Sequence, residues 1–470
     1  MALDIPSAKQ WIETFWQQEV MDSLAAYVRI PNKSPHFDPD WEANGYMEQA
    51  VQHMADWVNA HALPGMQLKI HRLPHRTPTI LIEIPGDIDD TVLLYGHLDK
   101  QPEFVGWHEG LSPWEPVIKD DKLYGRGGAD DGYAIYSSIA AIQLLQEQKI
   151  AHPTAFILIE ASEESGSTDL PHYMNELEII IGSPSLVIAL DSTAGNYDQM
   201  WVTTSLRGIM LANLKVQVLE EGAHSGMAGG IVSSSFRVLR SLLSRIENED
   251  TGEIKPDFLQ AQIPPVRRKE AEYAGQVLGN DFNTMFTFAG DGKPLTQDPT
   301  ELVLNNTWRA SLAITGADGL PSPEEAGNVL RPYTTAKLSL RIPPTADPDV
   351  VAAGMRKLIE ENPPNGAKVD FDFEHPSPGW HAPLSSDLLQ EAMDHASEDW
   401  FGLPSVSIGC GGSIPFMEFL ANKYPQAEFV VTGVLGPHSN AHGPNEFLHL
   451  PTVKKITGCV ASIIEKWADR

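Results

Sequence analysis

Cysteine is nearly absent from this sequence, whose 470 residues include only Cys410 and Cys459. Two cysteines exclude a disulfide framework and a zinc site built from thiolates, because both need more of these side chains. The chain also has no run that approaches the ~20 apolar residues needed to span a bilayer. Its first residues, MALDIPSAKQWIETFWQQEV, lack the basic and apolar segments of a secretory signal. We therefore expect a soluble, cytoplasmic protein with no membrane partner.

Basic residues are scarce as well, with 33 lysines and arginines against 63 aspartates and glutamates. The formal net charge of -30 would repel an extended phosphate backbone, so nucleic acid is not an expected partner. The acidic excess fits either a solvated surface or carboxylates whose charge is offset by bound cations. Net charge alone does not distinguish these two interpretations.

Apolar residues are plentiful, since 42% of the chain is hydrophobic, which is enough for a large core. The runs TVLLYGH, TAFILIEAS and SLVIALDS predict buried strands at 91–97, 154–162 and 185–192. The segment 131–148, between the first two strands, predicts a helix. Buried strands that alternate with helices indicate an α/β fold with a mainly parallel sheet.

The pattern changes in the middle of the chain and later changes back. After about residue 204, half-exposed strands and amphipathic helices predict a smaller α+β unit, although residues 250–305 show no readable pattern. The α/β pattern returns near residue 380. We therefore predict a larger domain formed by residues 1–204 and 381–470, with an inserted domain at 205–380.

Ionisable residues gather at the ends of the predicted strands. In open α/β sheets, ligands bind in the crevice at the carboxyl ends of the strands. Several carboxylates in one crevice repel one another unless a cation lies among them, and imidazole with carboxylate suits zinc or manganese. The residues concerned are His97, Asp99, Asp130, Asp131, Glu163, Glu164 and Asp191.

Each of these signals has an ordinary interpretation when it is taken alone. A His-x-Asp pair is commonly a surface or hydrogen-bonded pair, and Asp-Asp before a helix commonly caps that helix. Glu-Glu is commonly a solvated run of charge. The metal hypothesis therefore rests on the conjunction of these signals at strand ends within one architecture.

Six short motifs carry a resemblance to a known family: YGHLDKQP, LYGRGGADDG, IEASEESGS, ALDST, AHSG and AHGPNE, in this order. With them the chain resembles the aminoacylase and carnosine dipeptidase family of co-catalytic di-metal peptidases, closest to its carnosine dipeptidase-like (cytosolic dipeptidase) branch. The resemblance implies a catalytic α/β domain interrupted by an inserted α+β lid that forms a homodimer. It also implies two divalent metal ions per chain, with zinc favoured and manganese as the alternative.

The resemblance further implies a ligand set in which one carboxylate, Asp130, bridges the two metals. Each metal would have one imidazole and one carboxylate of its own: His97 with Asp191, and His442 with Glu164.

Other roles are implied for residues beside these ligands. His442 is preferred to His438 because the family's histidine stands three residues before an Asn-Glu pair. Asp99 would accept a hydrogen bond from the second ring nitrogen of His97 and so fix its tautomer. Glu163 would be the general base for a metal-bridged hydroxide that attacks the peptide bond of dipeptides or short peptides.

The substrate-binding residues implied by the resemblance have open alternatives. His224, in GAHSGM, resembles a lid histidine that contacts the substrate carbonyl, and an ordinary turn residue is the alternative. Arg341 and Ser413 resemble residues beside the substrate carboxylate, and a structural salt bridge is equally open for Arg341. Two other functions also stay open: an N-acyl amino acid deacylase of the same family, and a non-catalytic binding protein on this fold.

Overall fold

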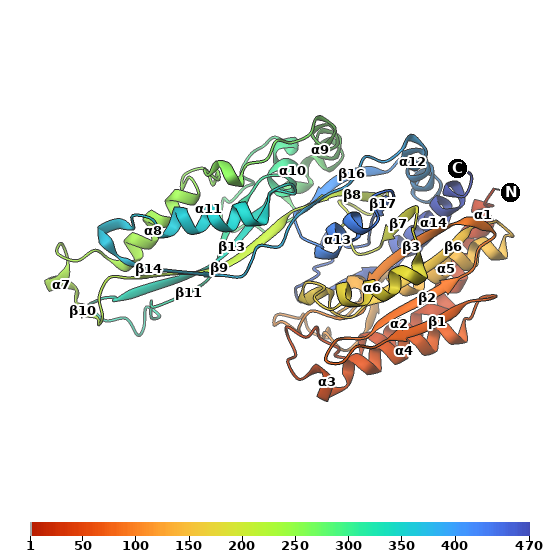
Figure 1. The fold of residues 1–470 in the computed structure, drawn as a ribbon, viewed down its shortest axis with the longest axis horizontal. Helices are drawn as coiled ribbons and strands as arrows, with labels where there is room; N and C mark the ends of the chain where they lie inside the picture. Colours follow the sequence, from red (N-terminus) through yellow and green to blue (C-terminus); the bar gives the residue numbers. More distant parts are fainter. Residues whose placement is uncertain (1) are drawn as a thin grey trace.

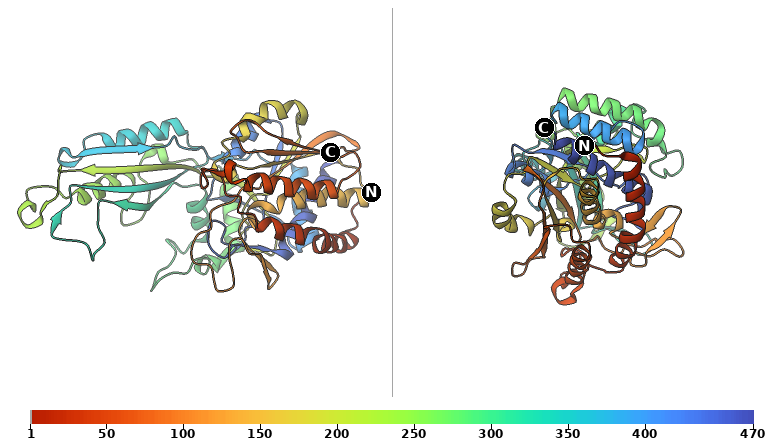
Figure 2. Two further views of the ribbon diagram at one scale, coloured as in Figure 1. Left: turned by 90° about the horizontal axis from the view of Figure 1, so that it is seen from below. Right: turned by 90° about the vertical axis from the view of Figure 1, so that its right-hand side faces the viewer.

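The computed structural model describes residues 2–470, which form two bodies (Figure 1). One body holds a large sheet between helices, together with both chain termini. The other is an elongated sheet with helices along one face, and it projects from the first body as an arm (Figure 2).

The large sheet confirms the α/β fold class that the sequence predicts. Its six strands have the order β1-β2-β6-β3-β7-β17. The last four of these are parallel to one another, and the first two pair in antiparallel fashion. The strands are β1 (Gln67–His71), β2 (Thr79–Ile84), β3 (Ile88–His97), β6 (Pro153–Glu160), β7 (Leu186–Ala189) and β17 (Glu428–Val431).

Helices cover both faces of this sheet (Figure 1). No helix among residues 2–470 is long and apolar enough to cross a membrane. The helices of this body are α1 (Ile5–Phe15), α2 (Met21–Val28), α3 (Trp41–Asn44), α4 (Tyr46–Ala60), α5 (Ala134–Glu147), α6 (Leu170–Ile181), α12 (Asp387–Phe401), α13 (Pro415–Lys423) and α14 (Leu450–Trp467), with a π-helical turn, η1 (Trp16–Val20), after α1.

Burial of both sheet faces explains the continuous apolar runs in the sequence, because alternate side chains of a strand point to opposite faces. In β3, Leu94 belongs to a core that also contains residues of α5 and α14. Its neighbours Leu93 and Tyr95 belong to a second core, which contains residues of α6 and α13. Strand β3 therefore packs on helices from both sides.

The second body is built on a four-stranded antiparallel sheet with the order β11-β13-β9-β14. Every second residue of its strand β9 is buried against two helices, as expected for a sheet with one solvated face. Its elements are β9 (Gly208–Gln217), α8 (Ser235–Ile246), β11 (Ser311–Asp318), β13 (Tyr333–Ile342), α11 (Pro348–Glu360) and β14 (Lys368–Phe373). The end remote from the large sheet carries β10 (Ala223–His224), α7 (Ser225–Ala228) and β12 (Val329–Leu330) (Figure 1).

Part of the segment between residues 205 and 380 packs on the first body instead. Two helices, α9 (Pro265–Leu278) and α10 (Pro299–Thr307), bury Leu304 against Trp201 and Val406 in a separate small core. The last two residues lie in β8 (Trp201–Leu206) and β16 (Val406–Cys410). The ranges 1–204, 205–380 and 381–470 remain our prediction of the domain bounds.

Two short sheets complete the structure, with the orders β15-β8-β16 and β18-β5-β4. The second of them joins the chain near residue 120 to the segment that follows His442. The strands not yet named are β4 (Val117–Lys119), β5 (Lys122–Tyr124), β15 (Trp380–His381) and β18 (Phe447–His449).

Candidate metal centre

The carboxyl ends of three neighbouring parallel strands carry predicted ligands. His97 is the last residue of β3, and Asp191 follows the end of β7 by two residues. Glu164 lies in a short turn, η3 (Glu163–Ser165), just after β6. Because β6 and β7 both pair in parallel with β3, these residues meet at one edge of the sheet.

Asp130 and His442 reach the same edge from other segments. Asp130 lies in a glycine-rich turn, η2 (Gly128–Gly132), directly before α5. His442 lies in the loop between β17 and β18, at a left-handed backbone conformation with φ of 60°. The loop before β18 thus closes over the strand ends.

Two groups of three potential ligands result, and Asp130 belongs to both. In the first group, His97 Nε2 lies 3.3 Å from Asp130 Oδ1 and 3.8 Å from Asp191 Oδ2. In the second, His442 Nε2 lies 3.1 Å from Asp130 Oδ2 and 3.2 Å from Glu164 Oε2. The structure therefore brings all five predicted ligands together, with Asp130 between the two groups. Their roles as ligands stay predictions.

Burial and neighbouring charges strongly shift the pKa values of His97, His442 and Asp130. Burial lowers the pKa of His97, but the charge of Asp191 and the bond to Asp130 outweigh it and raise this pKa well above its usual value. Burial also lowers the pKa of His442, which Glu164 and Asp130 nevertheless raise to about 11. Burial raises the pKa of Asp130, but hydrogen bonds from the two imidazoles lower it below its usual range. Both imidazoles therefore carry protons at neutral pH.

The remaining carboxylates shift toward their neutral forms. Burial, followed by the charge of Asp191, raises the pKa of Glu163 well above its usual value. Burial and the charge of Asp130 raise the pKa of Glu164. Burial also raises the pKa of Asp191 to about 7, although the charge of His97 lowers it. Full ionisation of these carboxylates and Asp130 would place more negative charge in the cluster than two imidazolium groups offset, and the raised pKa values reflect this repulsion as well as burial.

These residues fit divalent cations in both charge and donor chemistry. Oε1 of Glu164 is buried and has no hydrogen-bond partner among the residues that the structure describes, although buried oxygens are normally paired. A cation would engage such an oxygen. Imidazole nitrogens with carboxylate oxygens form a donor set that zinc and manganese accept.

Loading the site with cations is expected to release at least two protons per chain at pH 7, because a metal binds only the neutral imidazole and the ionised carboxylate, and the pKa of Asp191 is raised to about 7. The pKa of His442 is raised to about 11 and that of His97 is raised well above its usual value in the metal-free state, so cation binding must displace protons from these rings. Cation affinity should accordingly rise with pH. Calorimetric titration with Zn²⁺ in buffers of different ionisation enthalpy measures the protons released. His442→Ala should release about one proton fewer, and a release that is the same in both proteins would contradict the assignment.

Asp99 supports the turn that carries the paired glutamates. Its carboxylate accepts the backbone N–H groups of Glu163 and Glu164, at 3.1 and 3.0 Å. The Nδ1 of His97 donates to the carbonyl oxygen of Asp99 at 3.1 Å, while the carboxylate Oδ1 lies 3.5 Å from the same nitrogen. The Asp99 backbone therefore orients the ring, and its side chain mainly holds the turn.

The loop of His442 is held by an ion pair that the sequence did not reveal. Arg126 Nη1 lies 2.6 Å from Glu446 Oε2, and both side chains are buried. Arg126 Nη2 also donates to the carbonyl oxygen of Gly443 at 2.5 Å, and the Gly127 N–H donates to Glu446 Oε1 at 3.0 Å. This network fixes the residues on the C-terminal side of His442. The other candidate, His438, is exposed and belongs to neither ligand group.

Arg341 and Ser413 lie together where the two bodies join. The Nη1 of Arg341, in β13, donates to Ser413 Oγ at 3.1 Å, and this hydroxyl donates to the carbonyl oxygen of Arg207 at 2.6 Å. Among residues 2–470, no carboxylate is found in an ion pair with Arg341. Burial lowers the pKa of Arg341, which remains a cation at neutral pH. Its guanidinium is thus free to receive an anionic group.

His224 lies apart from the other predicted site residues. It is exposed and ends β10 at the tip of the projecting arm, remote from the large sheet (Figure 1). Its Nδ1 accepts the backbone N–H of Gly226 at 3.1 Å, which leaves Nε2 to carry the proton of the neutral ring. Within one chain, the structure does not bring His224 to the candidate ligands.

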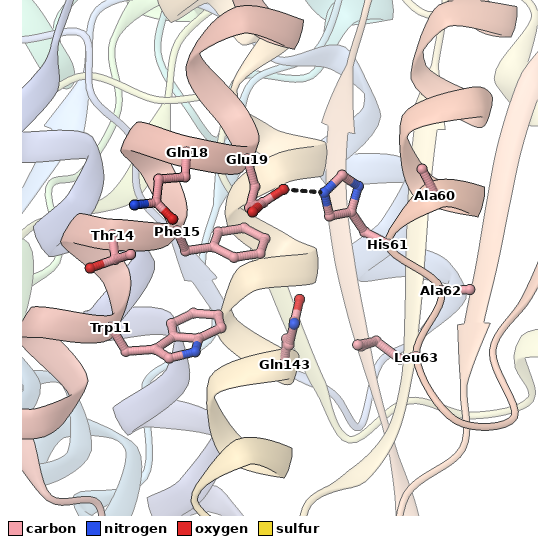
Figure 3. A pocket seen from close by; sticks show the side chains of 10 residues that line it. All are labelled: Trp11, Thr14, Phe15, Gln18, Glu19, Ala60, His61, Ala62, Leu63 and Gln143. Carbon is pink, nitrogen blue, oxygen red and sulfur yellow. Dashed lines mark hydrogen bonds and ion pairs between the residues drawn. The ribbon is translucent and has the colours of Figure 1, made fainter.

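A surface cavity of about 460 Å³ lies among the N-terminal helices, away from the ligand groups (Figure 3). His61 lines it, but Nε2 of this ring pairs with Glu19 at 3.1 Å and Nδ1 donates to the Trp57 carbonyl at 2.8 Å. Both nitrogens of the His61 ring are therefore satisfied within the fold, and we assign no ligand to the cavity. It is lined by Trp11, Thr14, Phe15, Gln18, Glu19, Ala60, His61, Ala62, Leu63 and Gln143.

Comparison with known proteins adds independent information. The model of Peptidase family M20/M25/M40 matches residues 93–466. The cysteinylglycine-S-conjugate dipeptidase of Corynebacterium striatum is 27% identical over 432 residues, which cover 89% of each chain. Two solved structures share the fold, each at 20% identity. The dipeptidase Dug1p of Saccharomyces cerevisiae has a TM-score of 0.78 with 100% of both chains covered, and human carnosine dipeptidase 1 has a TM-score of 0.76 with 99% covered.

Proposed function

Because the chain belongs to peptidase family M20/M25/M40, we propose that it hydrolyses the peptide bond of dipeptides with two divalent cations bound. The observation that carries this proposal is the pair of ligand groups that share Asp130, with Glu163 next to them. The relative from Corynebacterium is named a dipeptidase, and the chain covers 89% of its length. Zinc is the proposed cation, with manganese as the alternative.

Glu163 is the proposed proton carrier. When bound, the two cations polarise the scissile carbonyl and lower the pKa of a water molecule. A carboxylate oxygen of Glu163 accepts a proton from the attacking water and later donates it to the leaving amine. Burial raises the pKa of Glu163, which strengthens its hold on a proton and favours delivery to the leaving amine, while the positive charge of bound cations would favour the ionised form that accepts the proton first. Asp99 holds the backbone of Glu163 in place by accepting its N–H.

Arg341 and Ser413 are proposed to bind the carboxylate of the substrate. The guanidinium presents a planar set of donors that matches a carboxylate, and no acidic side chain among residues 2–470 pairs with it. The hydroxyl of Ser413, 3.1 Å from Arg341 Nη1, would orient the guanidinium or contact the same carboxylate. This binding mode favours substrates with a free C-terminus.

We expect Arg341→Met to raise KM for dipeptides about 10- to 100-fold and to change kcat little, because a hydrogen bond to a charged group contributes about 1.5–3 kcal/mol. Steady-state kinetics with a dipeptide and with its C-terminal amide would measure this effect. The amide lacks the carboxylate, so its KM should be nearly the same for both proteins. Equal losses on the two substrates would refute carboxylate binding by Arg341.

We propose that the protein acts as a cytoplasmic homodimer in which His224 completes the site of the partner subunit. The support is geometric: His224 lies at the tip of the arm, and its Nε2 is available to donate to a substrate oxygen. A second copy could place this group over the metal centre. Both cysteines are free thiols, which agrees with a reducing compartment.

A panel of dipeptides and N-acyl amino acids, offered to the zinc- and manganese-loaded protein, tests the proposed function. Hydrolysis of dipeptides that is blocked by acetylation of the substrate amine would support a dipeptidase. Faster hydrolysis of the N-acyl amino acids would instead indicate a deacylase. Failure to hydrolyse any member of either set, with both cations bound, would indicate a non-catalytic binding protein.

A further inference from the structure

Gln101 makes a contact with the metal centre that its position in the sequence does not explain. Its side chain is 8% exposed, and it lies four residues beyond His97. The amide Nε2 donates to Oε2 of Glu164 at 2.5 Å. The other oxygen of this carboxylate, Oε1, is the buried atom that has no hydrogen-bond partner among the described residues. The two oxygens of Glu164 therefore have different surroundings.

The backbone of Glu164 is fixed by separate contacts. Its N–H donates to Asp99 Oδ2 at 3.0 Å, and the turn is anchored further by Ser34 Oγ, 2.5 Å from Ser165 Oγ. These bonds leave the side-chain torsions of Glu164 unrestrained, and the last of them, about the bond to the carboxylate, has a broad energy minimum. Among residues 2–470, the contacts of the Glu164 carboxylate are with Gln101 and His442. The histidine is itself a predicted ligand.

We propose that Gln101 is a positioning residue: by donating to Oε2 of Glu164, the oxygen that lies 3.2 Å from His442 Nε2, it fixes the Glu164 carboxylate for the cation of the Glu164–His442 group. A neutral amide suits this task, because it donates to the carboxylate without adding a charge that would repel a cation. Carboxylates that bind metals are themselves commonly hydrogen-bonded, and loss of such a partner costs about 10- to 100-fold in metal affinity. The inference rests on the two-cation site proposed above and not on the choice of substrate.

The proposal is tested by titrating metal-free protein with Zn²⁺ in competition with a chelator, which reads affinity without relying on activity. Gln101→Met keeps the length of the side chain and removes the donor. We expect it to weaken one of the two sites about 10- to 100-fold and to leave the other unchanged. Gln101→Asn, whose amide is one methylene too short, should behave in the same way. In a His442→Ala background, Gln101→Met should have little further effect, because the affected site is already lost.

Ser34→Ala is the matched control, since it removes a hydrogen bond to the same turn without touching the Glu164 carboxylate. It should keep both affinities, and thermal unfolding of the metal-free proteins would show whether any variant is loosened as a whole. Wild-type affinity at both sites in Gln101→Met and Gln101→Asn would overturn the proposal. Equal weakening of both sites, matched by Ser34→Ala, would overturn it in favour of a general structural role. Failure of the wild-type protein to bind two ions would overturn the proposed function as well.

Discussion

Replacement of Glu163 with glutamine is expected to slow dipeptide hydrolysis by about 10²- to 10⁴-fold while both cations stay bound, because the amide removes only the proton transfer. Glutamine has nearly the shape of glutamate, and the turn is held by backbone bonds to Asp99 that the substitution leaves in place. The loss should therefore appear in kcat rather than in metal content. Measurement of kcat at saturating substrate, with elemental analysis of the same samples, checks both parts.

Glu164→Gln is the control for this experiment, since it makes the same chemical change one residue away in the same turn. Here the substituted side chain belongs to a ligand group, so the protein should lose affinity for one cation. Activity should recover in part when excess metal is added. If Glu163→Gln were the variant that lost metal and Glu164→Gln kept it, the two roles would have to be exchanged.

The inner strands β3, β6 and β7 of the large sheet could be predicted from the sequence, because burial on both faces requires apolar residues at nearly every position. The run predicted at 91–97 corresponds to the second part of β3, which extends from Ile88 to His97. Helix α9 could not be predicted in this way. It buries mainly small or polar side chains, such as Ala271, Ala274 and Arg267, so its sequence shows no apolar stripe.

The candidate ligands could be named from short motifs, since each motif places a characteristic side chain at the end of a strand. The contacts that hold these ligands depend on pairs far apart in the chain. Arg126 and Glu446 are separated by 320 residues, and no local pattern links them. The Asp99 carboxylate lies 3.5 Å from Nδ1 of the nearby His97, its predicted partner, and it also accepts backbone N–H groups 64 and 65 residues away. Such pairings depend on the tertiary fold and leave no periodic signal in the sequence.

Mixing of two inactive variants, His224→Ala and Glu163→Ala, is expected to restore about a quarter of wild-type activity if each site uses His224 of the partner subunit. The expectation follows from the position of His224 at the tip of the arm, where β10 pairs with β12 far from the ligand groups of its own chain. Each variant alone lacks one required group at both of its sites. Neither should hydrolyse dipeptides at an appreciable rate.

In a hybrid dimer, one of the two sites has both required groups. The subunit that carries His224→Ala has an intact Glu163, and it faces an intact His224 from its partner. The opposite site lacks both groups. Random pairing of equal amounts makes about half of the dimers hybrids, and each hybrid has one of its two sites restored, which gives about one quarter of the wild-type rate.

Activity is measured after native mass spectrometry of differently tagged chains has confirmed subunit exchange. A mixture of His224→Ala with an Arg341→Met protein, assayed at substrate concentrations well below the KM of Arg341→Met, provides a second comparison, because it shows whether Arg341 acts on the same side of the interface as Glu163. Recovery with Glu163→Ala would establish that the catalytic carboxylate and the lid histidine act on one substrate from different chains. If exchange is complete and activity stays at the level of the separate variants, His224 does not serve the partner's site, and the arm must contribute to the protein in some other way.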